Sequence, residues 1–98
     1  MARIELAPEL QYDFDRIFDH LSEYAVDDVP GRIREIIQAI DVLQFNPLIG
    51  RAASADTREL VIGRSARGYV ALYRYIEPVD TVFVLAIRSQ REAGYERT

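Results

Sequence analysis

The chain has 98 residues and is expected to form a single domain, residues 1–98. It contains no cysteine, which excludes disulfide bonds, thiol catalysis and cysteine-ligated zinc sites. Its net charge of −4 is uneven, because residues 1–50 carry ten acidic and four basic side chains (net −6) and residues 51–98 carry six acidic and eight basic ones (net +2). With no signal-peptide segment and no apolar stretch near the roughly 20 residues of a membrane helix, we expect a cytoplasmic protein that makes no membrane contact.

The first half of the chain predicts a strand and then a helix. Residues 3–6 alternate between polar and apolar side chains, and Pro8 suits the first turn of the helix that follows. Residues 9–25 repeat apolar side chains every three or four positions, which predicts one buried helix face: Leu10, Phe14, Ile17, Phe18, Leu21 and Ala25. The charged side chains of this segment are expected mostly on the opposite face: Asp13, Asp15, Arg16, Asp19 and Glu23.

A second helix is expected from about residue 30 to residue 45. Asp28 can cap this helix, and Pro30 lies near its first turn. Its apolar face repeats the spacing of the first helix, through Ile33, Ile36, Ile37, Ile40 and Leu43. Asn46 ends the helix, because a residue that precedes proline disfavours the α conformation. The short break between the helices predicts an antiparallel helical hairpin.

The second half of the chain changes to the period of strands. Residues 47–57 are expected to form a loop, and strands are expected at 59–62, 68–76 and 81–88, where β-branched and aromatic residues concentrate. The near-continuous apolar run at 81–88 predicts a strand that is covered on both faces. The predicted fold class is therefore α+β in the order β-α-α-β-β-β, with the helical hairpin packed on a mainly antiparallel sheet.

Few side chains suit catalysis or metal binding. His20 is the only histidine and lies in an acidic helix, where a solvated helix face explains it better than a metal site does. Neither a glycine-rich nucleotide loop nor the serine-nucleophile motif GxSxG is present. We therefore expect no metal and no cofactor.

Arginines in the second half are the main sign of a binding surface. Arg64 and Arg67 lie in the turn between the first two strands of the meander, and Arg88 and Arg91 lie at the end of the last strand, with Tyr95 beyond them. Arginine beside tyrosine suits contacts with phosphate groups, bases or an acidic protein surface. Ordinary solvated arginines in turns are the alternative interpretation.

Three tyrosines share one side of the second strand of the meander: Tyr69, Tyr73 and Tyr75. This stripe suits either a half-buried sheet face or a platform for stacking bases. The half-buried face is the favoured interpretation.

Several stretches of the chain resemble the RelE/ParE toxin superfamily. They are residues 58–63 (RELVIG), 68–74 (GYVALYR) and 82–88 (VFVLAIR), preceded by LQFNPLIG at 43–50, which resembles the end of a helix in that family. The resemblance covers about residues 3–95 and implies the family fold, which has the same β-α-α-β-β-β order. It also implies a toxin of a type II toxin–antitoxin system, held inactive by a cognate antitoxin.

The resemblance implies one of two activities. RelE-like members cut mRNA, usually on the ribosome, whereas ParE-like members inhibit DNA gyrase. The RNA-cutting branch carries basic residues on its central strands, at positions that fall on Glu59, Val61 and Val70 here. Arg91 and Tyr95 match the basic residue and the tyrosine near the C-terminus of that branch. Relatives commonly have a histidine where this chain has Ser89 and Gln90.

These departures, together with a net negative charge that opposes binding to dense phosphate, favour the ParE-like branch. The hypothesis is a plasmid-stabilisation type of toxin that binds and inhibits DNA gyrase without chemistry of its own. Its target contact is expected at Arg64, Arg67, Arg88, Arg91 and Tyr95, and its antitoxin is expected to dock across the helical hairpin and sheet. The alternatives are a RelE-like, ribosome-dependent mRNA endonuclease that uses Arg91 and Tyr95, and an inactive binding partner with the toxin fold.

Overall fold

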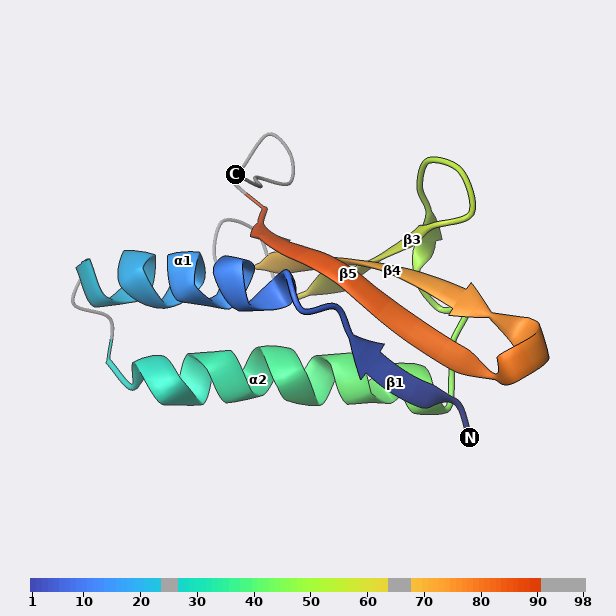
Figure 1. The fold of residues 1–98 in the computed structure, drawn as a ribbon. Coiled ribbons are helices and arrows are strands. Elements are labelled where there is room, and N and C mark those ends of the chain that lie inside the picture. The colour runs from blue at the N-terminus through green and yellow to red at the C-terminus, as the bar shows by residue number, and fades with distance from the viewer. Residues whose placement is uncertain (24–26, 64–67, 91–98) are drawn as a thin grey trace.

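The computed structural model describes residues 1–23, 27–63 and 68–90. Its helices are α1 (Leu10–Glu23) and α2 (Val29–Asp41), followed by the 3-10 helix η1 (Val42–Gln44). Its strands are β1 (Arg3–Leu6), β2 (Arg51–Ala52), β3 (Arg58–Ile62), β4 (Tyr69–Ile76) and β5 (Thr81–Ser89), with the 3-10 turn η3 (Glu77–Val79) before β5. Figure 1 shows the two helices side by side against the sheet. The predicted α+β order is confirmed, with β2 as an addition.

The strands form one mixed sheet in the order β1-β5-β4-β3-β2. β1 runs parallel to β5 at one edge, and all other neighbouring strands are antiparallel. β2 has only two residues, Arg51 and Ala52, which pair with Glu59 and Arg58. The prediction of a loop was wrong at these two positions, because two residues are too few to show the alternation that marks a strand.

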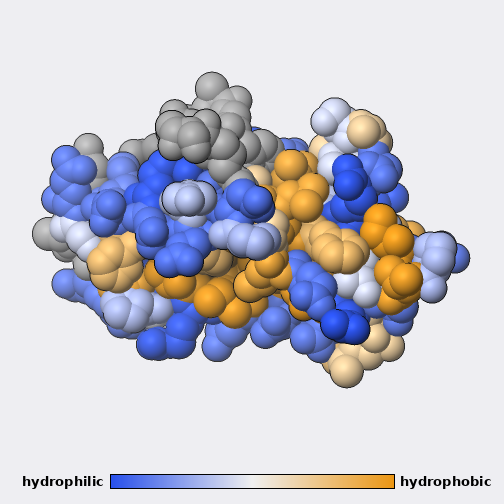
Figure 2. All heavy atoms as spheres, viewed as in Figure 1, coloured by the Kyte–Doolittle hydropathy of each residue, from blue (hydrophilic) through white to orange (hydrophobic). Residues whose placement is uncertain are grey.

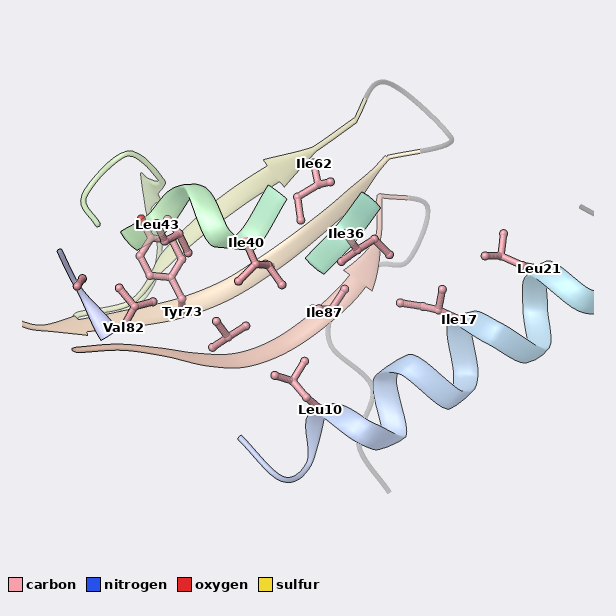
Figure 3. Close-up of a cluster of buried hydrophobic side chains, with 13 residues drawn as sticks. Leu10, Ile17, Leu21, Ile36, Ile40, Leu43, Ile62, Tyr73, Val82 and Ile87 are labelled. Atoms are coloured by element: carbon pink, nitrogen blue, oxygen red, sulfur yellow. The ribbon is translucent and has the colours of Figure 1, made fainter. Parts of the chain in front are cut away.

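Both helices lie on one face of the sheet, and the hydrophobic core fills the space between the two layers (Figure 3). The buried helical side chains are Leu10, Ile17 and Leu21 of α1, Ile36 and Ile40 of α2, and Leu43 of η1. Those of β4 and β5 in the core are Ala71, Tyr73, Val82, Val84 and Ile87. Tyr73 is fully buried and its neighbours Tyr69 and Tyr75 pack partly buried against the core, which confirms the half-buried tyrosine face.

The second helix begins as predicted and ends earlier. Asp28 is its N-cap and accepts a hydrogen bond of 3.2 Å from the Gly31 amide. The α-helix stops at Asp41, and η1 continues the helical path in a tighter form, so that Leu43 still reaches the core.

Three side chains differ from their predicted burial. Phe18 and Ile37 were expected in the core, but they are 46% and 41% exposed because the buried stripe of each helix is narrow and is filled by their neighbours Ile17 and Ile36. Asp13 was expected on the solvent side of α1 and is fully buried, against the backbone of Ile87.

β5 is covered on both faces over part of its length: on the side away from the helices Thr81 and Ala86 are 6% and 5% exposed, whereas Phe83 between them is 37% exposed. A bulge also contributes to the apolar run at residues 81–88. Tyr73 pairs with Val84 and Leu72 pairs with Ala86, so Leu85 is an extra residue that reverses the alternation of side chains. As a result Val84 and Ile87 both face the core although they are three positions apart.

A close approach at Gly50 ties the connection between η1 and β2 to the sheet. The Gly50 amide donates a hydrogen bond of 2.8 Å to the hydroxyl of Tyr73. A Cβ atom at Gly50 would lie 2.7 Å from that hydroxyl and 2.8 Å from the Glu59 carbonyl oxygen, so no larger residue fits without movement. No helix among residues 1–23, 27–63 and 68–90 is both long and apolar enough to cross a membrane.

Candidate functional site

The ends of three strands meet at one end of the sheet. Ile62 of β3 pairs with Tyr69 of β4, which in turn pairs with Ser89 of β5. The Gln90 amide donates a hydrogen bond of 3.0 Å to the Gly68 carbonyl oxygen. The described residues that flank 64–67 and that directly precede residue 91 therefore lie at neighbouring positions of the sheet.

Four of the predicted target-binding residues, Arg64, Arg67, Arg91 and Tyr95, lie outside the described residues. Their place at the target contact stays a prediction. Arg88 is the one whose surroundings can be described, and it lies close to the end of β5.

Arg88 faces away from the helices, on what we call the open face of the sheet. Partners in the register of a sheet point to the same side, and the core residues Ala71, Tyr73, Val84 and Ile87 mark the side of the helices. The open face therefore consists of the alternate residues: Arg51, Glu59, Val61, Val70, Leu72, Arg74, Phe83, Ala86 and Arg88.

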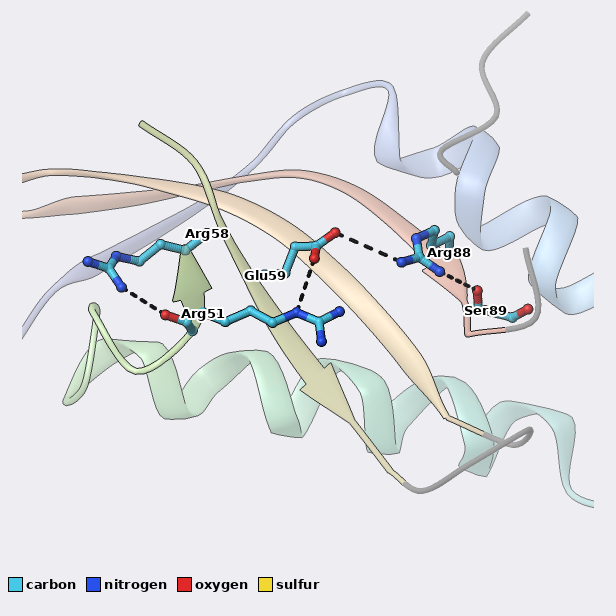
Figure 4. A network of polar contacts seen from close by, with 6 residues as sticks. Arg51, Arg58, Glu59, Arg88 and Ser89 are labelled. Atoms are coloured by element: carbon cyan, nitrogen blue, oxygen red, sulfur yellow. Dashed lines mark hydrogen bonds and ion pairs between the residues drawn. The ribbon is translucent and has the colours of Figure 1, made fainter. Parts of the chain in front are cut away.

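A polar network crosses this open face (Figure 4). Glu59 accepts a hydrogen bond of 3.2 Å from Nε of Arg51 and lies 4.0 Å from Nη2 of Arg88. Nη1 of Arg88 also donates to the Ser89 carbonyl oxygen at 3.2 Å, and the Arg88 side chain is only 16% exposed. Contacts with Glu59 and Ser89 thus fix the Arg88 side chain, which is largely withdrawn from solvent. Its pairing with Glu59 could not be inferred from the sequence without the strand register.

Two further arginines near this face have partners as well. Arg74 forms an ion pair of 2.9 Å with Asp56. Arg58 turns to the other side and donates to the carbonyl oxygens of Leu48 and Gly50 at 3.3 and 2.8 Å, which fixes the connection before β2. Arg58 therefore has a structural role in this fold.

The positions that would be basic in the RNA-cutting branch do come together. Glu59, Val61 and Val70 all lie on the open face, and Val70 pairs directly with both Val61 and Arg88. Val61 is exposed, whereas Val70 is buried. Cleavage of RNA requires proton transfer and stabilisation of charge at the phosphate, and a carboxylate with two valines supplies neither a general acid–base pair nor added positive charge.

A metal centre is not formed by the residues the structure describes, since no three potential ligands gather within them. His20 is exposed on α1, as the interpretation of a solvated helix face predicts. Burial raises the pKa of the Tyr69 hydroxyl, an effect that nearby Arg32 partly offsets.

The helical layer offers a second, apolar surface. Phe14, Phe18, Ile33 and Ile37 are apolar residues of the two helices that remain partly or largely exposed, and we call them the helix band. Figure 2 shows hydrophobic surface between α1 and α2, bordered by hydrophilic residues. This exposed apolar surface is suited to contact with another protein.

Comparisons with known proteins agree with this architecture. The family model described as "ParE toxin of type II toxin-antitoxin system, parDE" matches residues 4–94. No curated protein sequence matches the chain significantly. Among solved structures, a chain of the chromosomal ParDE toxin–antitoxin system from P. aeruginosa is similar with a TM-score of 0.73 and 20% identity, over 91% of this chain and 96% of that chain.

A chain of the intact E. coli RelBE toxin–antitoxin complex is similar with a TM-score of 0.62 and 13% identity, over 94% of this chain and 100% of that chain. At these identities the two solved structures establish the fold alone, which is two helices packed on a mixed five-stranded sheet. The family model spans nearly the whole sequence. The chain therefore belongs to the ParE toxin family of type II toxin–antitoxin systems.

Proposed function

We propose that this toxin acts by binding DNA gyrase and blocking its cycle, without chemistry of its own. The observation that carries the proposal is the composition of the open face, where Glu59, Val61 and Val70 stand at the positions that are basic in the RNA-cutting branch. The surface that would hold RNA for cleavage there carries the Glu59 carboxylate, which offsets part of the positive charge of Arg51 and Arg88. A protein target suits this surface better than a polyphosphate does.

The contact with gyrase is proposed at the end of the sheet where β3, β4 and β5 meet. In the sequence, Arg64 and Arg67 follow β3, Arg91 and Tyr95 follow β5, and Arg88 lies close to the end of β5. Arginine and tyrosine are enriched among the residues that dominate binding energy at protein interfaces. This arrangement supports a single contact surface at that end.

A cognate antitoxin is proposed as the second partner, with the helix band as part of its binding site. Phe18 and Ile37 are exposed apolar side chains that a partner would remove from water. The exposed charges around them on the helices are mostly acidic: Asp15, Asp19, Glu23, Glu35 and Asp41. An antitoxin segment that combines apolar and basic side chains fits this surface in both respects.

The gyrase proposal is tested with purified chain and purified gyrase in a supercoiling assay. We expect supercoiling to fall as the chain is added and to recover when the antitoxin is added in equal amount. Unimpaired supercoiling at a saturating concentration of folded chain would refute the gyrase target. Cut transcripts in cells that express the chain, lost on Tyr95→Phe, would instead support the RelE-like endonuclease.

A further inference from the structure

On the open face, the Glu59 carboxylate of β3 forms ion pairs with two arginines, which lie on strands at opposite sides of β3. Oε1 of Glu59 on β3 lies 3.2 Å from Nε of Arg51 on β2, and Oε2 lies 4.0 Å from Nη2 of Arg88 on β5. β4 lies between β3 and β5, so the Glu59 side chain reaches across a strand to its second partner. Figure 4 shows the carboxylate between the two guanidinium groups.

The pair of Glu59 and Arg88 is more withdrawn from solvent than an ordinary surface ion pair, whereas Arg51 is 59% exposed. The side chains of Glu59 and Arg88 are only 17% and 16% exposed, so salt and water screen their attraction less than at a free surface. The Glu59 backbone is held in the ladder between β2 and β4, which fixes the point from which the side chain extends. The carboxylate is therefore kept near both arginines by the sheet itself.

Guanidinium groups recognise carboxylates and phosphates with the same planar fork. Arg51 and Arg88 thus have the chemistry of an anion site, and Glu59 supplies the anion from within the chain. A phosphate from outside has to displace a carboxylate that is tethered at the site, and a short tether gives its group an effective concentration in the millimolar range.

We propose that Arg51 and Arg88 form a phosphate-binding site whose built-in occupant is Glu59, and that this occupant keeps the phosphates of RNA off the open face. Glu59 is then the residue that determines the selectivity of this surface. This role of Glu59 rests on the proposed function, because a surface that excludes the phosphates of RNA is left to bind a protein. RNA binding is measured on the isolated chain without gyrase. The proposal about Glu59 can therefore fail while the gyrase proposal stands, and the reverse.

The test compares the wild-type chain with Glu59→Gln, which removes the charge and keeps the size of the side chain. Binding of a fluorescein-labelled single-stranded RNA is followed by anisotropy at low ionic strength. We expect Glu59→Gln to bind the RNA about tenfold more tightly than the wild type. The plot of the logarithm of the association constant against the logarithm of the salt concentration should be steeper by about 0.7, which is the value for one added phosphate contact on a single strand. In NMR titrations with inorganic phosphate, the Nε–Hε signals of Arg51 and Arg88 should shift in this variant and stay unchanged in the wild type.

Glu5→Gln is the matched control. It makes the same charge change on the same sheet face, but frees the more exposed Arg3, which lies 2.8 Å from Glu5 at the sheet edge. We expect less than a twofold gain in RNA affinity from it, and a return to wild-type affinity when Arg88→Gln is added to Glu59→Gln. Equal RNA affinity of the wild type and Glu59→Gln, or equal gains from Glu59→Gln and Glu5→Gln, would overturn the proposal. If circular dichroism shows that Glu59→Gln does not fold, Glu59→Thr, which suits a strand, takes its place in the same comparison.

Discussion

The amide of Ile87 on β5 donates a hydrogen bond of 2.9 Å to the buried carboxylate of Asp13 on α1. Arg16 completes this contact, since its Nη1 lies 3.1 Å from Asp13 and its Nη2 donates to the Ile87 carbonyl oxygen at 3.2 Å. β1 pairs with β5 only as far as Leu6 opposite Val84. Beyond the end of β1, Asp13 and Arg16 of α1 therefore bind the amide and the carbonyl oxygen of Ile87, as a neighbouring strand would. Ile87 directly precedes Arg88.

The Asp13 contact should be a major local contribution to stability. Asp13→Ala removes the acceptor that the Ile87 amide and Nη1 of Arg16 share, and loss of a buried acceptor of this kind costs about 1–3 kcal/mol, more where charged groups are involved. Against a typical stability of about 5–15 kcal/mol this is a large fraction. Urea unfolding followed by circular dichroism measures the change.

Asp15→Ala is the control for that experiment, because Asp15 is exposed on the same helix. It should change the free energy of unfolding by less than about 0.5 kcal/mol. Asp13→Asn keeps one acceptor for the Ile87 amide and should fall between the two. Equal stability of Asp13→Ala and Asp15→Ala would contradict the role assigned to this contact.

The hydrogen bond between Gly50 and Tyr73 leads to a second prediction. Tyr73→Phe keeps the buried ring and removes the acceptor of the Gly50 amide, which should cost about 1–3 kcal/mol. Gly50→Ala should cost at least as much, because its Cβ would meet the rigid carbonyl oxygen of Glu59 at 2.8 Å. Tyr12→Phe, at an exposed tyrosine, is the control and should leave the urea midpoint unchanged.

Much of the fold could be predicted because it depends on local patterns. The helical spacing of apolar residues, the Asp28 cap and the β-branched strands are all visible within a few neighbouring residues, and they yield the element order that the structure confirms. The family resemblance rests on the same strand segments. The parallel position of β1 beside β5 could not be chosen from pattern alone, because residues 3–6 suit either an edge or a central strand.

The contacts that shape the candidate site are of another kind. Asp13 and Ile87 are 74 positions apart, and Glu59 meets Arg88 only across a strand that lies between them. Such pairs depend on the register of strands and on the exact rotation of a helix, neither of which a single sequence states. Asp13 stands three residues after Leu10 and four before Ile17, on the buried stripe of α1, so its spacing was a signal of burial that its charge obscured.

Buried tyrosines should make the fold sensitive to high pH. Burial raises the pKa of Tyr73 and of Tyr69 above the ordinary value of 10.0. Since the unfolded chain loses these protons at lower pH than the folded chain does, stability is fully present below about pH 10 and is lost as the pH rises through the folded-state pKa values. Urea midpoints measured between pH 8 and pH 11.5 should fall above pH 10, and the fall should be smaller in Tyr73→Phe. A midpoint that rises over this range would contradict the sign.

The end of β5 should be needed for toxicity. We expect Arg88→Ala combined with Arg91→Ala to restore growth of cells that express the chain without antitoxin, while antitoxin binding measured by calorimetry is retained. Arg88→Lys, which keeps the charge and loses the planar fork, should restore growth only in part. Arg34→Ala on the exposed side of α2 is the control and should remain toxic. Full toxicity of the double variant would refute the role of these two arginines.

The helix band should be needed for neutralisation and not for toxicity. Phe18→Asp combined with Ile37→Asp places two charges where an apolar antitoxin segment is proposed to dock, and each is at a position already more than 40% exposed, so the fold should tolerate them. Burying one apolar side chain of this kind fully contributes about 1.5–3 kcal/mol. Since about 1.4 kcal/mol corresponds to a tenfold change in affinity, we expect the antitoxin to bind the double variant at least tenfold more weakly. Cells that express this variant with the antitoxin should stop growing, because the proposed gyrase contact at the end of the sheet is unchanged. Wild-type antitoxin affinity in the double variant would place the antitoxin elsewhere, whereas loss of toxicity along with antitoxin binding would show that both partners use the same surface.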